Sequence, residues 1–176
     1  YAAAFLKGYA PSTVVYDRKT TFNNDGTKYT PDNYTGKFKG PVSMRNALGG
    51  SLNIPAIKAG YLAGMDNVMN LVRGMGVPIP EDTYGLAAAI GTTNISSMDM
   101  ARGYSVFANG GYKVDPTAII KIEDGSGNIL EEFTEPKDRQ IALDPQVAYL
   151  VNDVLTDKMA RPDQWWRDQI TLPNQL

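Results

Sequence analysis

The spacing of apolar and polar residues along the chain predicts a mainly helical protein. After Asp144, apolar residues recur at helical spacing from Val147 to Leu155, which is the pattern of one buried helix face. Shorter segments with helical patterns are residues 1–7, 43–48, 54–62, 67–73 and 97–108. The residues expected to cap these helices are Ser43, Asn53, Asp66, Ser96 or Ser97, and Asp144.

The rest of the pattern predicts few strands. Residues 12–16 are short and β-branched, and residues 118–133 form two β-rich runs around a turn at 124–127, which predicts a hairpin. Residues 29–40 show no period and predict an ordered loop. The small apolar residues 85–93 suit close packing. The expected fold class is therefore mainly α with a β-hairpin, and the chain is short of strands for a self-contained α/β protein.

Composition changes this picture through the chemistry that it excludes. The 176 residues carry a net charge of −2 and contain no cysteine and no histidine. No cluster of Lys and Arg suggests a nucleic-acid partner, and no apolar run is long enough for a membrane segment. Without histidine, Ser-His-Asp and Cys-His catalysis are excluded within this chain, and another base, usually lysine, would be needed. We expect no metal and no cofactor.

Both ends of the sequence look interrupted. Residues 1–8 lack a methionine and the basic region of a signal peptide, and they look like a helix already under way. Residues 171–176 close no helix or strand. We expect residues 1–176 to be one partial domain, truncated at both ends.

Two polar residues at a joint between helices are the main candidates for chemistry. In "GGSLNIPAIK", residues 49–58, two glycines precede Ser51, Leu52 and Asn53. Side chains at i and i+2 point the same way in extended or turn backbone, so Ser51 and Asn53 share a direction if Ser51 precedes the helix. A hydroxyl can pass a proton, and a carboxamide both donates and accepts hydrogen bonds. The simpler alternative, that Ser51 only caps a helix, is favoured on these residues alone.

The wider sequence resembles the transpeptidase domain of class A (bifunctional) penicillin-binding proteins. Residues 29–60, "YTPDNYTGKFKGPVSMRNALGGSLNIPAIKAG", are similar to the region around the second motif of that family, Ser-x-Asn. Residues 1–17, "YAAAFLKGYAPSTVVYD", resemble the helix that follows its catalytic Ser-x-x-Lys. "MDMARGYSVFANGGYKVDPTAIIKI" resembles its long helix and following hairpin, and "ARPDQWWRDQITLP" is similar to the stretch before its Lys-Ser/Thr-Gly strand.

This resemblance implies D,D-transpeptidation, the cross-linking of peptidoglycan stem peptides. In the family, the serine of Ser-x-x-Lys attacks the penultimate D-Ala carbonyl to form an acyl-serine, with the lysine as base. An amine from a neighbouring peptide then takes the acyl group. By the resemblance, Ser51 relays a proton toward the leaving amine, and Asn53 orients the substrate and the lysine. β-Lactams imitate the D-Ala-D-Ala end and stay attached.

The resemblance also implies partners, a location and an incomplete fold. The implied partners are stem peptides, β-lactams and the rest of the transpeptidase domain. The implied location is the extracytoplasmic face of the bacterial plasma membrane, with the anchor outside this chain. Because the family's central antiparallel sheet comes from segments on either side, we expect the helical part of the fold with an exposed apolar face.

Only the middle motif of the three occurs in this sequence. None of the serines has a lysine three positions later; they are Ser12, Ser43, Ser51, Ser96, Ser97, Ser105 and Ser126. Lys19-Thr20-Thr21 comes nearest to the third motif but has threonine where glycine is required. We expect the nucleophile and third motif to lie outside these residues and the chain alone to be inactive. The alternatives are a non-catalytic interaction or complementing module, and a segment of a related serine β-lactamase or carboxypeptidase.

Two acidic features have structural explanations. Asp124, Ser126 and Asn128 loosely match a calcium loop, but a hairpin turn accounts for them better. Glu131 and Glu132 are adjacent, so on a strand they face opposite sides and do not form a glycosidase pair.

Two aromatic features remain open. Trp165 and Trp166 are expected to anchor the end of the chain to a core, rather than to stack on glycan. Tyr29, Tyr34 and Phe38 either line a substrate groove or only cover the helices, and the sequence does not favour one alternative.

Overall fold

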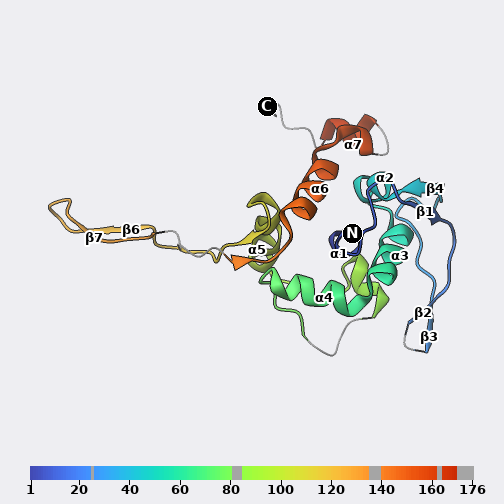
Figure 1. The fold of residues 1–176 in the computed structure, drawn as a ribbon, viewed down its shortest axis with the longest axis horizontal. Coiled ribbons are helices and arrows are strands. Elements are labelled where there is room, and N and C mark those ends of the chain that lie inside the picture. Colours follow the sequence, from blue (N-terminus) through green and yellow to red (C-terminus); the bar gives the residue numbers. More distant parts are fainter. Residues whose placement is uncertain (25, 81–84, 135–139, 162–163, 170–176) are drawn as a thin grey trace.

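Helices gathered around α1 make up most of the regular structure, as Figure 1 shows. The computed structural model describes residues 1–24, 26–80, 85–134, 140–161 and 164–169. The helices are α1 (Ala2–Leu6), α2 (Met44–Gly49), α3 (Asn53–Ala63), α4 (Met65–Gly74), α5 (Ser97–Ala108), α6 (Pro145–Thr156) and α7 (Gln164–Gln169), with 3₁₀ helices η1 (Leu86–Ile90) and η2 (Lys158–Ala160). The strands are β1 (Val14–Asp17), β2 (Phe22–Asn24), β3 (Thr27–Tyr29), β4 (Gly40–Ser43), β5 (Tyr112–Lys113), β6 (Lys121–Glu123), β7 (Ile129–Glu132) and β8 (Gln140–Ile141).

The strands pair two by two, and no larger sheet forms among the described residues. β1 pairs with β4, β2 with β3, β5 with β8 and β6 with β7, each antiparallel. In the first pair, Val14 lies opposite Ser43 and Asp17 lies opposite Gly40, which brings the start of α2 beside β1. The mainly helical fold class and the hairpin around residues 124–127 are therefore confirmed. The other pairs escaped prediction because strands this short show no period in the sequence.

The main core lies where α1, α3 and α6 meet, with α2 and α5 packed against it. The largest fully buried apolar side chains are Met44, Ile54, Ile57, Val106 and Val154. Ala3 and Ala4 of α1 are also buried in it, and residues this small let neighbouring helices approach closely. The apolar stripe that the sequence predicted after Asp144 is buried through Val147, Val151 and Val154.

Most of the predicted helix ends are confirmed. The hydroxyl of Ser43 accepts from the N–H of Asn46, that of Ser96 accepts from Asp99, and the carboxylate of Asp144 accepts from Gln146. Each satisfies a backbone donor that a helix start leaves without an intrahelical partner. These caps bond within two or three residues of themselves, which is why the sequence alone predicts them.

Two predicted caps are wrong. Asn53 is the first residue of α3, whose N-cap is Leu52 and carries no side-chain cap bond. Asp66 lies in the first turn of α4, whose N-cap is Gly64 at φ +82°. The glycine turns the chain so sharply between α3 and α4 that α4 starts earlier than its apolar pattern indicates. For Asn53, a cap from elsewhere in the fold replaces the local one, as described below.

The small apolar segment at residues 85–93 packs closely, as predicted. It forms η1 and lies against α3. A Cβ added at Gly60 of α3 would lie 3.2 Å from the Cβ of Ala89, so the glycine allows this contact. Residues 81–84 lie outside the described part of the chain.

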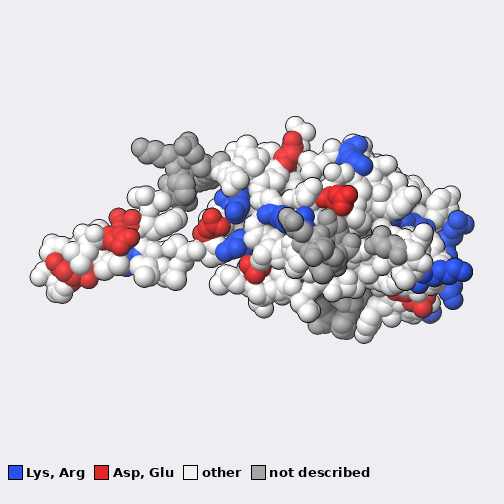
Figure 2. All heavy atoms as spheres, turned by 90° about the horizontal axis from the view of Figure 1, so that it is seen from below, with Lys and Arg blue, Asp and Glu red and all other residues white. Residues whose placement is uncertain are grey.

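The β6–β7 hairpin extends away from the helices (Figure 1). All of its strand residues are exposed. Figure 2 shows acidic side chains on this arm, whereas Lys and Arg gather at the opposite end of the molecule. Exposed large apolar side chains lie on α5, the arm and α6, including Met98, Tyr104, Ile120, Leu130 and Tyr149. The expected apolar docking face stays a prediction.

No helix among the described residues is long and apolar enough to cross a membrane. Trp166 lies on α7 and is 39% exposed, while the side chain of Trp165 lies outside the described part of the chain. The anchoring role expected for this pair stays a prediction.

Candidate active site at the joint of α2 and α3

Ser51 occupies the bend between the two helices. It follows the C-cap of α2, Gly50, and has φ +51°, the only described non-glycine residue with a positive φ. Its N–H donates to Leu48 at 3.1 Å, and the N–H of Leu52 donates to Ala47 at 3.0 Å. These two bonds define a Schellman motif, whose left-handed position is usually glycine. The predicted bend, rather than continuous helix, is confirmed.

The backbone of Ser51 pays a conformational cost. A left-handed conformation costs an L-residue roughly 1–2 kcal/mol relative to the right-handed one. The cap of α3 is Leu52 and not Ser51, so the helix-cap explanation of this serine is wrong. Its side chain is exposed. Strained residues of this kind cluster at functional sites, and the observation supports a role for the hydroxyl beyond helix capping.

The two glycines before Ser51 are needed for space. A Cβ on Gly49 would lie 2.6 Å from the Cβ of Ala160 in η2, and a Cβ on Gly50 would lie 2.7 Å from the carbonyl oxygen of Asn46. Gly50 itself has φ −88°, which any residue adopts. The glycines therefore let α2 pack against η2 and let the chain turn tightly into Ser51.

Asn53 is held by two hydrogen bonds from the loop at residues 30–39. Its backbone N–H donates to Oδ1 of Asn33 at 2.9 Å, and its Nδ2 donates to the carbonyl oxygen of Asp32 at 2.8 Å. The first bond satisfies a donor of the first helical turn, so Asn33 caps α3 from 20 residues away. A carboxamide carries two N–H donors and one acceptor oxygen, so Asn53 keeps bonding capacity for a ligand.

Asn33 is itself fixed by the buried carboxylate of Asp17. Asp17 is 0% exposed and Asn33 is 5% exposed. Nδ2 of Asn33 lies 2.9 Å from each carboxylate oxygen of Asp17 and 3.0 Å from the carbonyl of Lys37. The N–H of Lys39 donates to Oδ2 of Asp17 at 2.8 Å. A buried charge is tolerated only with such partners, so this cluster is satisfied.

Two further groups surround this cluster. Nζ of Lys58 on α3 donates to the carbonyl oxygen of Tyr16 at 2.6 Å, a second tie between α3 and β1. Burial lowers the pKa of Lys58, and the charge of Arg18 lowers this pKa further, against the opposing effect of Asp17. At the N-cap of α1, burial raises the pKa of the Tyr1 phenol, and the charge of Asp17 raises it further.

The other side of α2 is held by ion pairs. The guanidinium of Arg45 pairs with the carboxylates of Asp153 and Asp157, the second at 2.9 Å. Both acids lie at the end of α6 or directly after it. The joint is therefore held from two sides, by the Asp17 cluster at the start of α3 and by these ion pairs between α2 and the end of α6.

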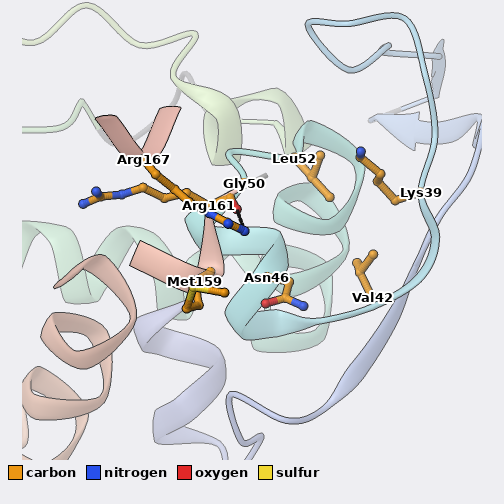
Figure 3. Close-up of a pocket in the computed structure, with 9 residues that line it drawn as sticks. Lys39, Val42, Asn46, Gly50, Leu52, Met159, Arg161 and Arg167 are labelled. Carbon is orange, nitrogen blue, oxygen red and sulfur yellow. Dashed lines mark hydrogen bonds between the residues drawn. The ribbon is translucent and has the colours of Figure 1, made fainter. Parts of the chain in front are cut away.

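A pocket of about 260 Å³ adjoins the joint. It is lined by Lys39, Val42, Asn46, Gly50, Leu52, Met159, Ala160, Arg161 and Arg167. Figure 3 shows Leu52, Lys39 and Val42 on one side and Met159 and Arg167 on the other. Gly50 and Leu52 flank Ser51 in sequence, but Ser51 and Asn53 are not among the lining residues. Three of the lining side chains are basic: Lys39, Arg161 and Arg167.

The structure brings Ser51 and Asn53 to one bend, and it adds Asp17 and Asn33, which sequence reasoning missed. Asp17 directly follows the predicted β-branched segment at residues 12–16, and Asn33 lies in the Pro-Asp-Asn stretch of the predicted loop. One feature of the sequence could have indicated Asp17: it is an acidic residue directly after an apolar strand, and a carboxylate that is buried there needs hydrogen-bond partners.

The remaining candidates behave as their structural explanations predict. Oδ1 of Asp124 accepts from the N–H groups of Ser126 and Asn128, and Oδ2 accepts from Nδ2 of Asn128. The turn explanation is therefore confirmed over the calcium loop. Glu131 and Glu132 are neighbours on β7, and both are exposed.

In the aromatic loop, Tyr34 is 94% exposed. Tyr29 and Phe38 are partly buried. The choice between a groove wall and a cover over the helices stays open.

Comparison with known proteins gives consistent results. A family model, the penicillin binding protein transpeptidase domain, matches residues 1–167. Penicillin-binding protein 1A of Neisseria meningitidis is 32% identical over 163 residues, which is 89% of this chain and 20% of that protein. The Haemophilus influenzae protein of the same name is 36% identical over 131 residues, 74% of this chain and 15% of that protein.

Solved structures agree with this result. The crystal structure of penicillin-binding protein 1A from Haemophilus influenzae superposes with a TM-score of 0.81 at 27% identity, covering 91% of this chain and 28% of that chain. The imipenem acyl-enzyme complex of penicillin-binding protein A from M. tuberculosis shares the fold, with a TM-score of 0.73, 20% identity and coverage of 87% and 40%.

The chain belongs to the penicillin-binding protein transpeptidase domain family. Within that family it is like the class A, penicillin-binding protein 1A type. It spans about one fifth of the length of the curated Neisseria relative.

Proposed function

We propose that this chain is part of a D,D-transpeptidase, which cross-links peptidoglycan stem peptides and is acylated by β-lactams. Ser51 relays a proton toward the leaving amine, and Asn53 orients the substrate and the basic lysine. The acylated serine, its lysine and the third motif belong to residues outside these 176. The transpeptidase works on the extracytoplasmic face of the bacterial plasma membrane.

The strained, exposed Ser51 carries this proposal. A glycine would remove the conformational cost at φ +51°, yet the chain places a hydroxyl there, two residues before a carboxamide that is fixed by hydrogen bonds. The hydroxyl donates and accepts, which is what a proton relay requires. Oδ1 of Asn53 accepts no hydrogen bond from the described residues, and it suits a lysine ammonium, because an ammonium only donates.

Labelling with fluorescent penicillin tests the proposal in the full-length product of the gene that contains this sequence. We expect Ser51→Ala and Asn53→Ala each to lower the second-order acylation rate constant by about 10²-fold, as for loss of a proton relay or a positioned donor. Ser12→Ala and Asn94→Ala change exposed residues of the same types elsewhere and are the matched controls. Unchanged acylation in the Ser51 and Asn53 variants would refute the roles proposed here.

The alternatives predict different results. A non-catalytic interaction or complementing module leaves the full-length protein unlabelled. A serine β-lactamase releases hydrolysed penicillin with turnover, and a carboxypeptidase releases D-Ala without cross-linking an added amine acceptor. Labelling of the 176-residue chain by itself would contradict the proposal that its nucleophile lies elsewhere.

A further inference from the structure

A buried relay of hydrogen bonds connects β1 to the first residue of α3. It runs from the carboxylate of Asp17 through the carboxamide of Asn33 to the backbone N–H of Asn53, with each bond at 2.9 Å. It joins segments 16 and 20 residues apart in the sequence. Among the described residues, neither Asp17 nor Asn33 forms a hydrogen bond with Ser51, so we expect any effect that they have on chemistry to act through Asn53 and the bend.

The charge of Asp17 sets the orientation of the Asn33 amide. An ionised carboxylate only accepts hydrogen bonds, so the Nδ2 side of Asn33 must face it. The Oδ1 side then faces the N–H of Asn53. A flipped amide would place oxygen against carboxylate and nitrogen against N–H, which loses every bond in the relay. The negative charge on β1 thereby determines that the start of α3 has an acceptor in front of it.

The local sequence supplies no substitute for this cap. The N-cap of α3 is Leu52, which has no side-chain acceptor, and Pro55 in the first turn has no N–H. The neighbouring bond from Nδ2 of Asn53 to the carbonyl of Asp32 uses the same loop. Loss of the Asn33 contact therefore leaves the backbone N–H of Asn53 without its acceptor, and only the bond from its side chain to Asp32 still holds Asn53 to the loop.

We propose that Asp17 and Asn33 are positioning residues for the transpeptidase reaction, because they hold the Ser51–Asn53 bend in the orientation that the reaction needs. The inference rests on the proposed function. It adds two buried residues, Asp17 on β1 and Asn33 in the loop at residues 30–39, to the two residues of the motif. Neither residue contacts substrate in this role.

Asn33→Asp in the full-length protein is the main test. At pH 8 two adjacent carboxylates repel, and the new side chain lacks the amide donor. We expect the acylation rate constant with fluorescent penicillin to fall at least about tenfold, the factor for about 1.4 kcal/mol, which is within the range for one hydrogen bond. At pH 5.5 we expect the new carboxyl at position 33 to bind a proton, because a second carboxylate lies next to it, and it can then donate to Asp17 and accept from Asn53. The ratio of variant to wild-type rate constants should then recover severalfold.

The charged and titratable groups around this pair are also present in the wild type. They are the Tyr1 phenol at the N-cap of α1, Lys58 on α3, Arg18 beside Asp17, and Asp32 in the loop. Dividing each variant rate constant by the wild-type value at the same pH cancels their common contribution, together with that of the catalytic lysine. Asn33→Leu can neither donate nor accept, so its ratio should stay low at both pH values.

Asn152→Asp is the matched control. Nδ2 of Asn152 donates to the carbonyl of Phe107 at 2.7 Å, so the variant also loses one partly buried amide bond, but between α5 and α6. Thermal unfolding of each variant shows whether it stays folded at the assay temperature. If Asn33→Asp fails to fold, Asp17→Asn replaces it, because it keeps one acceptor oxygen and should slow acylation about threefold at both pH values.

The outcomes separate the two proposals. Slower acylation in the Asp17 and Asn33 variants, with wild-type rates for Asn152→Asp, supports the inference. Equal effects of Asn33→Asp and Asn152→Asp, or a ratio for Asn33→Asp that does not recover at pH 5.5, would overturn it. If Ser51→Ala and Asn53→Ala leave acylation unchanged, the proposed function itself fails.

Discussion

The carboxamide nitrogen of Asn33 donates to both carboxylate oxygens of Asp17, at 2.9 Å each, with both residues buried. This pair connects a strand to the loop that caps α3, and so to the bend that carries Ser51 and Asn53. The bend is a Schellman ending in which a serine takes the position usually filled by glycine. Four predictions about the stability of the fold follow from this and other contacts.

Replacement of Ser51 by glycine should stabilise the fold. Glycine removes a left-handed strain of roughly 1–2 kcal/mol. Against this, the greater conformational entropy of glycine in the unfolded chain lowers stability by about 0.4–1 kcal/mol. We expect Ser51→Gly to raise the free energy of unfolding by about 0.5–1 kcal/mol in urea titrations. Ser51→Ala keeps the strain and should lie within about 0.5 kcal/mol of the wild type. Equal stability of the two variants would show that this backbone is unstrained.

The ion pairs of Arg45 should stabilise the fold only above acidic pH. Burial of Asp157 opposes its ionised form, but hydrogen bonds from the Met159 N–H and from Arg45 outweigh burial and keep its pKa below the ordinary value. A lowered pKa means stabilisation that is present above about pH 4 and lost as the pH falls through the folded-state pKa. We expect Arg45→Met to cost about 1 kcal/mol at pH 7 and less at pH 3, measured by urea unfolding.

Arg18→Met removes an exposed arginine and is the control for this experiment. It should cost less than about 0.5 kcal/mol at pH 7. A cost of Arg45→Met that is the same at pH 7 and pH 3 would argue against the ion pairs as its source.

The chain should not tolerate a side chain at Gly111. This glycine has φ +98°, and a Cβ there would collide with the carbonyl oxygen of Leu143. Its own carbonyl accepts from the N–H groups of Ala142 and Leu143, at 2.9 and 3.0 Å, so the two segments have little room to separate. We expect Gly111→Ala to cost at least about 2 kcal/mol in chemical denaturation, from strain and overpacking together.

The neighbouring glycine provides the comparison. Gly110 has φ +63° and open space around its Cβ position. Gly110→Ala should cost only the left-handed conformation, about 1 kcal/mol. Similar costs at the two positions would mean that α5 and the segment before α6 separate readily.

The β6–β7 arm should open far more readily than the core. Its hydrogen bonds, such as Phe133 N–H to the carbonyl of Ile120 at 2.9 Å, are surrounded by exposed residues. A two-stranded hairpin alone is marginally stable, whereas Ile57 on α3 is fully buried. We expect hydrogen exchange protection in the arm to be lower than at Ile57 by about 10²-fold or more. Comparable protection would indicate that another surface covers the arm.

Local chemistry explains what was predictable about the fold. Ser43, Ser96 and Asp144 bond to N–H groups two or three residues ahead, so residue type and position were enough to place them. The turn at Asp124 is local for the same reason. Asn53 was assigned as a cap because its residue type suits one, but Asn33 provides that acceptor from the preceding loop.

The sequence by itself determined the helical class, most helix ends, the hairpin and the Ser51-x-Asn53 spacing from which the proposed function starts. These features depend on periodicity and on contacts across a few residues. Only the tertiary structure decided what holds the motif in place: Asp17 with Lys39 across 22 residues, Asn33 with Asn53 across 20, and Arg45 with Asp153 across 108. A charged residue that becomes buried needs hydrogen-bond partners, but only the folded chain determines which groups come within hydrogen-bonding distance of it.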